Sequence, residues 1–347
     1  MGNKRERIYG WDFIRVVSAF MVIAAHLTAK ITEVWGVTGW FGDNANGGYG
    51  ALAVSAFFIL SGASLFLTAP ELENVEMIRS FYCKRIKSIF PMFLFLWTVF
   101  FVLRAVMSRN LLWGGSPWKI LLSLMGMDGY LKYLIPNYYS IGEWFLGALI
   151  ILYLLYPVLL RLFLRYRRAS TALITVLYIL LLCFNPFDMY PARNPITCVL
   201  LFWTGMLMCA YREKIYPWIS RPAVLCVLAA LLLVLLIVPL HLGEIFPMNL
   251  AGLLLVLVLW RAGDLLCRNE KVRTTVLSLS RSSFAVFLLQ MVLIANIFYR
   301  VFGPWINQHT VIFNGLILVV SAVIYLCGHV FSLCWEKAWR TFRAGKA

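Results

Sequence analysis

Three polar side chains in the first apolar stretch of the chain, Asp12, Arg15 and His26, have functional groups suited to acid–base and anion chemistry. Arg15 and His26 are eleven residues apart, a spacing that places both on one side of a helix, about 16 Å apart along its axis. Asp12 precedes Arg15 by three residues and can pair with it. Histidine is well suited to proton transfer near neutral pH. We therefore expect His26 to be catalytic and Asp12 to support the site.

The alternatives for these residues are structural. Arg15 can extend to water at the membrane surface, and His26 can bond a backbone carbonyl inside the core. An ionisable residue within an apolar span is nevertheless costly, which favours a functional interpretation of His26.

The basic run Lys84, Arg85 and Lys87 stands at the start of the third apolar segment. It matches the basic charge that collects at cytoplasmic ends of membrane spans. It also suits a multiply charged anion such as a nucleotide phosphate, because guanidinium and ammonium groups bind phosphate well. Arg15 would lie at the same side and could add to this site.

Two further segments contain candidate residues. Glu143 and Trp144 open the fourth apolar segment. Glu143 either interacts favourably with the dipole at the helix N-terminus or orients His26, which is expected at the same outer side. Ser61 and Gly62 interrupt bulky apolar residues, and such small residues allow helices to approach closely. Packing alone explains this second pair equally well.

Composition defines the class of protein. The chain has 347 residues, of which 62% are hydrophobic and 13% charged, values typical of a polytopic membrane protein. The net charge of +16 does not require nucleic acid, because cytoplasmic loops of membrane proteins collect Lys and Arg. Eight cysteines without a CxxC motif and four scattered histidines predict neither a disulfide framework nor a metal site.

Hydropathy predicts an all-α fold with about ten transmembrane helices, and one interfacial or re-entrant segment at 117–126 that is too short to cross. With both termini in the cytoplasm, 23 of the 31 Lys and Arg residues lie at the cytoplasmic side, as the positive-inside rule requires. The expected spans are 11–30, 50–69, 88–107, 142–162, 170–186, 195–211, 222–241, 245–261, 282–300 and 311–334.

Four blocks of residues follow one another in a recognisable order. The positions are Arg15 and His26; Phe57, Phe58, Ser61 and Gly62; Lys84, Arg85, Ile89 and Pro91; and Trp144, Leu146, Tyr156 and Pro157. Together they resemble acyltransferase family 3, a family of integral membrane acyltransferases. The chain departs from the family pattern at three places. Ser88 stands where a second Arg is common, Leu149 and Ile150 stand where some members have a Glu pair, and Gln290 stands where a histidine is common.

The resemblance implies one integral-membrane acyltransferase domain over residues 1–347, without an appended soluble domain, in a bacterial plasma membrane. It implies transfer of an acyl group, expected to be acetyl, from cytoplasmic acyl-CoA to a hydroxyl of an extracytoplasmic or lipid-linked glycan, with no permanently bound cofactor. Phosphate contacts would come from Arg15, Lys84, Arg85 and Lys87. His26 would be the general base or a transient acyl carrier.

In the same scheme Glu143 would orient His26, and Ser61 or Trp144 would stabilise the oxyanion. The alternative from another class is a transporter or flippase for a polar small molecule or lipid-linked sugar, which would move substrate without consuming acetyl-CoA. A third possibility is a membrane scaffold, in which neither His26 nor Arg85 matters.

Overall fold

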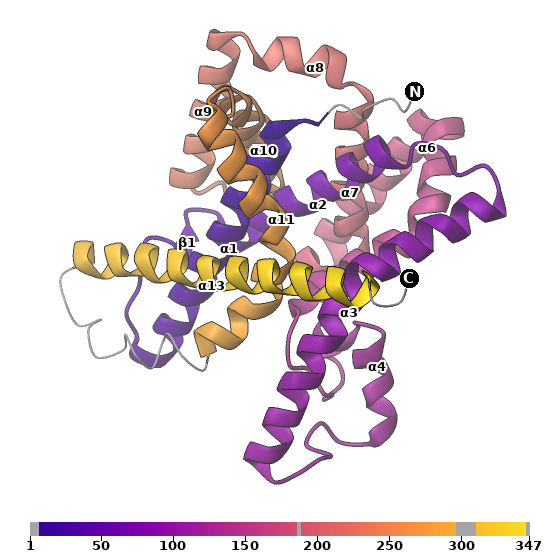
Figure 1. Ribbon diagram of the computed structural model, residues 1–347. Coiled ribbons are helices and arrows are strands. Elements are labelled where there is room, and N and C mark those ends of the chain that lie inside the picture. The colour runs from indigo at the N-terminus through magenta and orange to yellow at the C-terminus, as the bar shows by residue number, and fades with distance from the viewer. Residues whose placement is uncertain (1–6, 186–188, 296–309, 345–347) are drawn as a thin grey trace. The chain divides into compact units, whose positions relative to one another are not determined.

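The computed structural model describes residues 7–185, 189–295 and 310–344, and its regular structure is helical apart from one short hairpin (Figure 1). The hairpin pairs β1 (Asp43–Asn44) with β2 (Gly47–Gly48). The helices are α1 (Tyr9–Trp35), α2 (Tyr49–Thr68), α3 (Val75–Ser108), η1 (Pro117–Lys119), α4 (Ile120–Leu124), α5 (Asp128–Leu131), α6 (Glu143–Phe184), η2 (Pro191–Arg193), α7 (Pro195–Ala210), α8 (Arg212–Ile219), α9 (Pro222–Ile237), α10 (Ile245–Leu266), α11 (Glu270–Leu293) and α13 (Thr310–Ala344).

The expectation of an all-α polytopic membrane protein is confirmed. Within the described residues, seven helices are long and apolar enough to cross a membrane: α1, α2, α3, α6, α10, α11 and α13. The count is eight if α7 and α8, bent by 85° at their junction, form one broken span. The helix α9 is apolar but shorter. These numbers fall below the ten spans expected from hydropathy.

One reason for the difference is α6, a stretch of 42 residues in which two helices meet at a kink at Tyr166. The two helices correspond to the expected spans 142–162 and 170–186. The arginine-rich stretch between these spans contains the break at Tyr166, whose backbone has φ −130° and ψ 35°, and is helical on either side of it. The stretch contains neither proline nor an internal glycine, and its Leu and Arg residues favour helix.

Two other helices begin earlier than hydropathy predicts. α3 starts at Val75 because Asn74 caps it, accepting a 2.8 Å bond from the backbone N–H of Met77. α11 starts at Glu270, where the side chain of Asn269 accepts from the backbone N–H of Lys271. The basic run of α3 therefore lies inside a helix, not at its first turn. The expected span 282–300 extends beyond the described residues.

The chain divides into two compact units. The first comprises Met1–Leu60, Ala210–Val286 and Ile294–Ala347, and in it α1 packs against α10 and α13. Gly10 allows the start of α1 to contact the backbone of Trp260 on α10, where any Cβ would overlap the Trp260 carbonyl. Trp11 and Trp260 meet edge to face with ring centroids 5.7 Å apart.

The second unit comprises Ser61–Cys209 and Phe287–Leu293. Gly62 lies directly against the backbone of Phe202 on α7, so the expected close helix approach at this glycine is confirmed. The segment 117–126 forms η1 and α4, both too short to cross a membrane, as expected.

Candidate active site

The helix α1 contains the first group of candidate residues. Its 27 residues run without a break, so Arg15 and His26 lie on the same side of one helix, as their spacing predicts. Both side chains are half-buried, whereas Ala19 and Val22 between them are buried. The helix ends at Gly36, which adopts the left-handed conformation at φ 69°.

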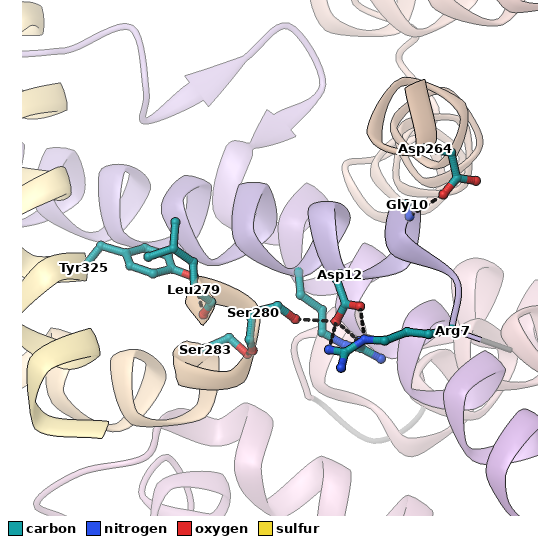
Figure 2. A network of polar contacts seen from close by, with 9 residues as sticks. Arg7, Gly10, Asp12, Asp264, Leu279, Ser280, Ser283 and Tyr325 are labelled. Carbon is teal, nitrogen blue, oxygen red and sulfur yellow. Dashed lines mark hydrogen bonds and ion pairs between the residues drawn. The ribbon is translucent and has the colours of Figure 1, made fainter. Parts of the chain in front are cut away.

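The carboxylate of Asp12 is the centre of a polar network in the first unit (Figure 2). It accepts hydrogen bonds from Arg7 Nε at 2.8 Å, from Arg15 Nη1 at 3.1 Å and from Ser280 Oγ at 2.7 Å. The Asp12–Arg15 pair was expected from the sequence and is confirmed. Asp12 is 3% exposed, so these bonds compensate a buried charge and fix one end of the Arg15 side chain.

Three other helices meet α1 around this network. The backbone N–H of Gly10 donates to Asp264 Oδ1 on α10 at 2.7 Å. Ser280 belongs to α11, and Tyr325 of α13 donates to the backbone carbonyl of the preceding residue, Leu279. Figure 2 shows these contacts on both sides of Asp12. Sequence reasoning missed all of them because the partners are distant along the chain.

A second histidine also has a polar partner in this unit. Ser282 Oγ on α11 lies 2.7 Å from Nδ1 of His329 on α13. The sequence offered no partner for His329, and a separation of 47 residues explains why. Ser282 also donates to the backbone carbonyl of Ser278. The Ser282–His329 pair therefore serves as a hydrogen-bonded contact between α11 and α13.

In the second unit, the three basic residues of α3 differ in exposure. Lys84 and Lys87 are exposed, whereas Arg85 is half-buried. The Arg85 guanidinium lies 5.7 Å from the centroid of the Phe81 ring and 5.8 Å from that of Tyr153. Its Nε is buried without a hydrogen bond among the described residues. Arg85 is thus the best placed of the three to hold an anion through its outer nitrogens.

Glu143 begins α6, and its carboxylate is engaged within its own unit. Lys132 Nζ lies 3.0 Å from Oε2, and the hydroxyl of Tyr139 donates to Oε1. The carboxylate side chain is only 8% exposed. Sequence reasoning missed both partners, although they lie eleven and four residues away. Burial and the neighbouring Glu143 carboxylate raise the pKa of Tyr139 well above its usual value, so the phenol remains a donor.

The remaining candidates also lie in the second unit. Ser61 is half-buried and precedes the tightly packed Gly62. Trp144 follows Glu143, and its ring centroid lies 6.0 Å from the guanidinium of Arg193. Within the described residues, no group of three His, Cys, Asp or Glu side chains is arranged to hold a metal ion.

Comparison with known proteins covers nearly the whole chain. A family model described as an acyltransferase domain matches residues 8–329, a range that includes every candidate residue above. No curated protein and no solved structure gives a match.

Proposed function

The chain belongs to this acyltransferase domain family and is a helical membrane protein. We therefore propose that it transfers an acyl group, namely acetyl, from acyl-CoA to a hydroxyl of a glycan. The observation that carries the proposal is α1, which holds a half-buried arginine and a half-buried histidine on one side within the matched region. The acceptor is an extracytoplasmic or lipid-linked sugar in this proposal.

The proposed orientation follows from charge. With the ten spans expected from hydropathy, placing both termini in the cytoplasm puts most Lys and Arg residues at the cytoplasmic side, as the positive-inside rule requires. Arg15 is then near the inner surface, and His26, about 16 Å further along α1, is nearer the outer surface. The bacterial plasma membrane is the expected location.

The donor's phosphates are assigned to basic residues of α3 in the second unit. Arg85 has its Nε buried and its guanidinium over two aromatic rings, which leaves its outer nitrogens for a bidentate phosphate contact. Exposed Lys84 and Lys87 supply flexible charges on the same helix. Arg15, held at one end by Asp12, stays a donor contact predicted from the sequence.

His26 is assigned the chemical step. It takes the proton of the acceptor hydroxyl while that oxygen attacks the thioester carbonyl. The tetrahedral intermediate then collapses, the carbon–sulfur bond breaks, and the histidine returns the proton to the CoA sulfur. The variant in which His26 first carries the acyl group also ends in an ester and free CoA. Ser61 and Trp144 are proposed contacts for the oxyanion.

Glu143 enters the proposal as a positioning residue. The sequence suggested that it orients His26, and this role stays a prediction. Its bonds to Lys132 and Tyr139 support a second contribution, which is to fix the connection before α6 in place.

The proposal is tested with membrane vesicles that contain the full chain and radiolabelled acetyl-CoA. We expect label to appear in the membrane glycan fraction with release of one CoA per acetyl group. Arg85→Ala should raise the KM for acetyl-CoA about tenfold or more, because a charge-assisted contact is lost. The matched control is Arg79→Ala, an exposed arginine of the same helix, which should leave KM unchanged.

Two results would contradict the proposal. One is an equal KM for acetyl-CoA in the Arg85→Ala and Arg79→Ala variants, which would show that Arg85 does not contact the donor. The other is movement of a lipid-linked sugar across the membrane without any consumption of acetyl-CoA, which would support a transporter instead.

A further inference from the structure

The second unit contains an arginine that the proposed reaction does not use. Arg193 ends η2, and its guanidinium lies 3.5 Å from the ring centroid of Tyr133 and 5.6 Å from that of Tyr190. Trp144 lies somewhat further, at 6.0 Å. We call these four residues the arginine–aromatic cluster. It joins η2 to the segment before α6 and to the first turn of α6 itself.

The positive charge of Arg193 has no counter-charge in the described part of the chain. No carboxylate there forms an ion pair with it, and its Nε is buried without a hydrogen bond. The acid at the start of α6, Glu143, is engaged by Lys132 at 3.0 Å. These two opposite charges balance each other, so the excess positive charge here belongs to Arg193. Aromatic rings stabilise a cation only in part, whereas an anion would satisfy it.

The cluster is held in a fixed geometry by the backbone. The backbone N–H of Arg193 donates to the carbonyl of Tyr190 at 2.8 Å. The carbonyl of Arg193 accepts from the hydroxyl of Tyr130 at 2.7 Å. On the other side, buried Asn194 accepts from the backbone N–H of Ile196 at the start of α7. These bonds fix the backbone that carries the Arg193 side chain, and the guanidinium itself is placed against the Tyr133 ring. A side chain held in this way loses less entropy when it binds a ligand.

The cluster is also accessible. Tyr133 is 49% and Tyr190 45% exposed, and Arg193 between them is partly exposed. Exposed aromatic faces suit the apolar face of a sugar ring, and phenol and indole groups add hydrogen bonds at its edge. A planar guanidinium matches the two oxygens of a carboxylate or phosphate.

We propose that the arginine–aromatic cluster binds an acidic sugar, with Arg193 on a carboxylate or phosphate of the acceptor and the aromatic rings against the sugar. The inference rests on the proposed function, because it identifies the acceptor class for the same reaction. It narrows the acceptor from any glycan to one that bears a negative charge close to the modified sugar.

The test uses the full-length protein in phosphatidylcholine nanodiscs and three soluble probes, D-glucuronate, glucose 1-phosphate and D-glucose. Binding is followed by saturation-transfer NMR. We expect both anionic probes to bind more tightly than glucose. Arg193→Gln should reduce their affinity about tenfold or more and leave glucose unchanged. Arg193→Lys keeps the charge but loses the planar guanidinium that can bind two oxygens at once. Its affinity for the anionic probes should lie between those of the wild type and of Arg193→Gln.

Arg165→Gln is the matched control. Arg165 also lies over a tyrosine, 5.5 Å from the ring centroid of Tyr166 in the same unit, but it is exposed and outside the cluster. Its replacement should leave all three affinities unchanged. Equal affinity of wild type and Arg193→Gln for the anionic probes would overturn the inference.

A second arm repeats the measurement in nanodiscs that also contain phosphatidylglycerol, and so separates a sugar from a lipid headgroup. If the variant alters binding of phosphatidylglycerol in the nanodisc but neither anionic sugar binds, the cluster is a headgroup site and the acceptor assignment is wrong. Acetyl-CoA consumption is measured on the same samples. Turnover without an Arg193-dependent preference for anions overturns only this inference, whereas Arg193-dependent binding without turnover overturns the proposed function instead.

Discussion

The hydroxyl of Ser280 on α11 lies 2.7 Å from the carboxylate of Asp12 on α1, although the two residues are 268 positions apart in the chain. The same carboxylate bonds Arg7 and Arg15. Asp12 therefore connects two helices of the first unit and holds the arginine that we assign to the acyl donor (Figure 2).

Replacing Asp12 with Asn should impair donor binding without removing a group that touches the reacting atoms. The amide cannot balance two guanidinium groups, so Arg15 loses its fixed position. We expect the KM for acetyl-CoA to rise about tenfold while kcat changes less. Ser280→Ala, which removes one bond and keeps the charge, should have a smaller effect in the same assay. An Asp12→Asn enzyme with unchanged KM would contradict this positioning role.

Burial raises the pKa of Asp128 to about 7. The pH dependence of stability should therefore report on this residue. Between the ordinary carboxyl value and about 7, the folded state binds a proton that the unfolded state has released, so stability falls as pH rises. Above about 7 this contribution levels off. Thermal unfolding of the purified protein from about pH 5 to about pH 8 should show the decline.

Asp128→Asn provides the control for that profile. The amide resembles the protonated carboxyl, so the variant should lose this part of the slope. Parallel profiles for the two proteins would show that Asp128 does not retain a proton in the folded state.

Packing at Gly62 leads to a prediction about stability. A Cβ at this position would overlap the backbone carbonyl of Phe202, which belongs to a helix and cannot move like a flexible side chain. Gly62→Ala should therefore lower the free energy of unfolding by about 1–3 kcal/mol. The control is Gly315→Ala on α13, where a Cβ would meet nothing within 4 Å and alanine favours helix. Comparable unfolding midpoints for the two variants would contradict the close packing.

The ion pair between Lys132 and Glu143 should couple energetically. Lys132→Met leaves a buried carboxylate with one partner fewer and should destabilise the protein by about 1–3 kcal/mol. Adding Glu143→Gln should restore part of that loss, since the uncompensated charge is then gone. A double-mutant cycle on chemical unfolding measures the coupling. Additive effects would indicate that the pair contributes no specific interaction.

The sequence allowed accurate prediction where the interactions are local. The unbroken helix through Arg15 and His26 follows from helical periodicity, and the Asp12–Arg15 pair from a spacing of three residues. Ser280 could not be predicted, because its contact with Asp12 depends on how α11 packs against α1. The same reason applies to Ser282 and His329.

The kink in α6 falls where the sequence predicts a boundary. Tyr166, at which two helices meet, lies between the expected spans 142–162 and 170–186, in the arginine-rich stretch. Two helix starts were predicted less well. Hydropathy does not detect the asparagine caps at Asn74 and Asn269, so α3 and α11 begin earlier than expected.

The most direct test of the central proposal compares two histidines in the same unit. Acetyl-CoA consumption and label transfer to membrane glycan are measured for wild type, His26→Ala and His329→Ala, with equal amounts of folded protein in the membrane. We predict that His26→Ala abolishes both signals, whereas His329→Ala, which loses only a helix contact to Ser282, retains activity. A His26→Ala protein that transfers acetyl groups at the wild-type rate would contradict the proposed mechanism.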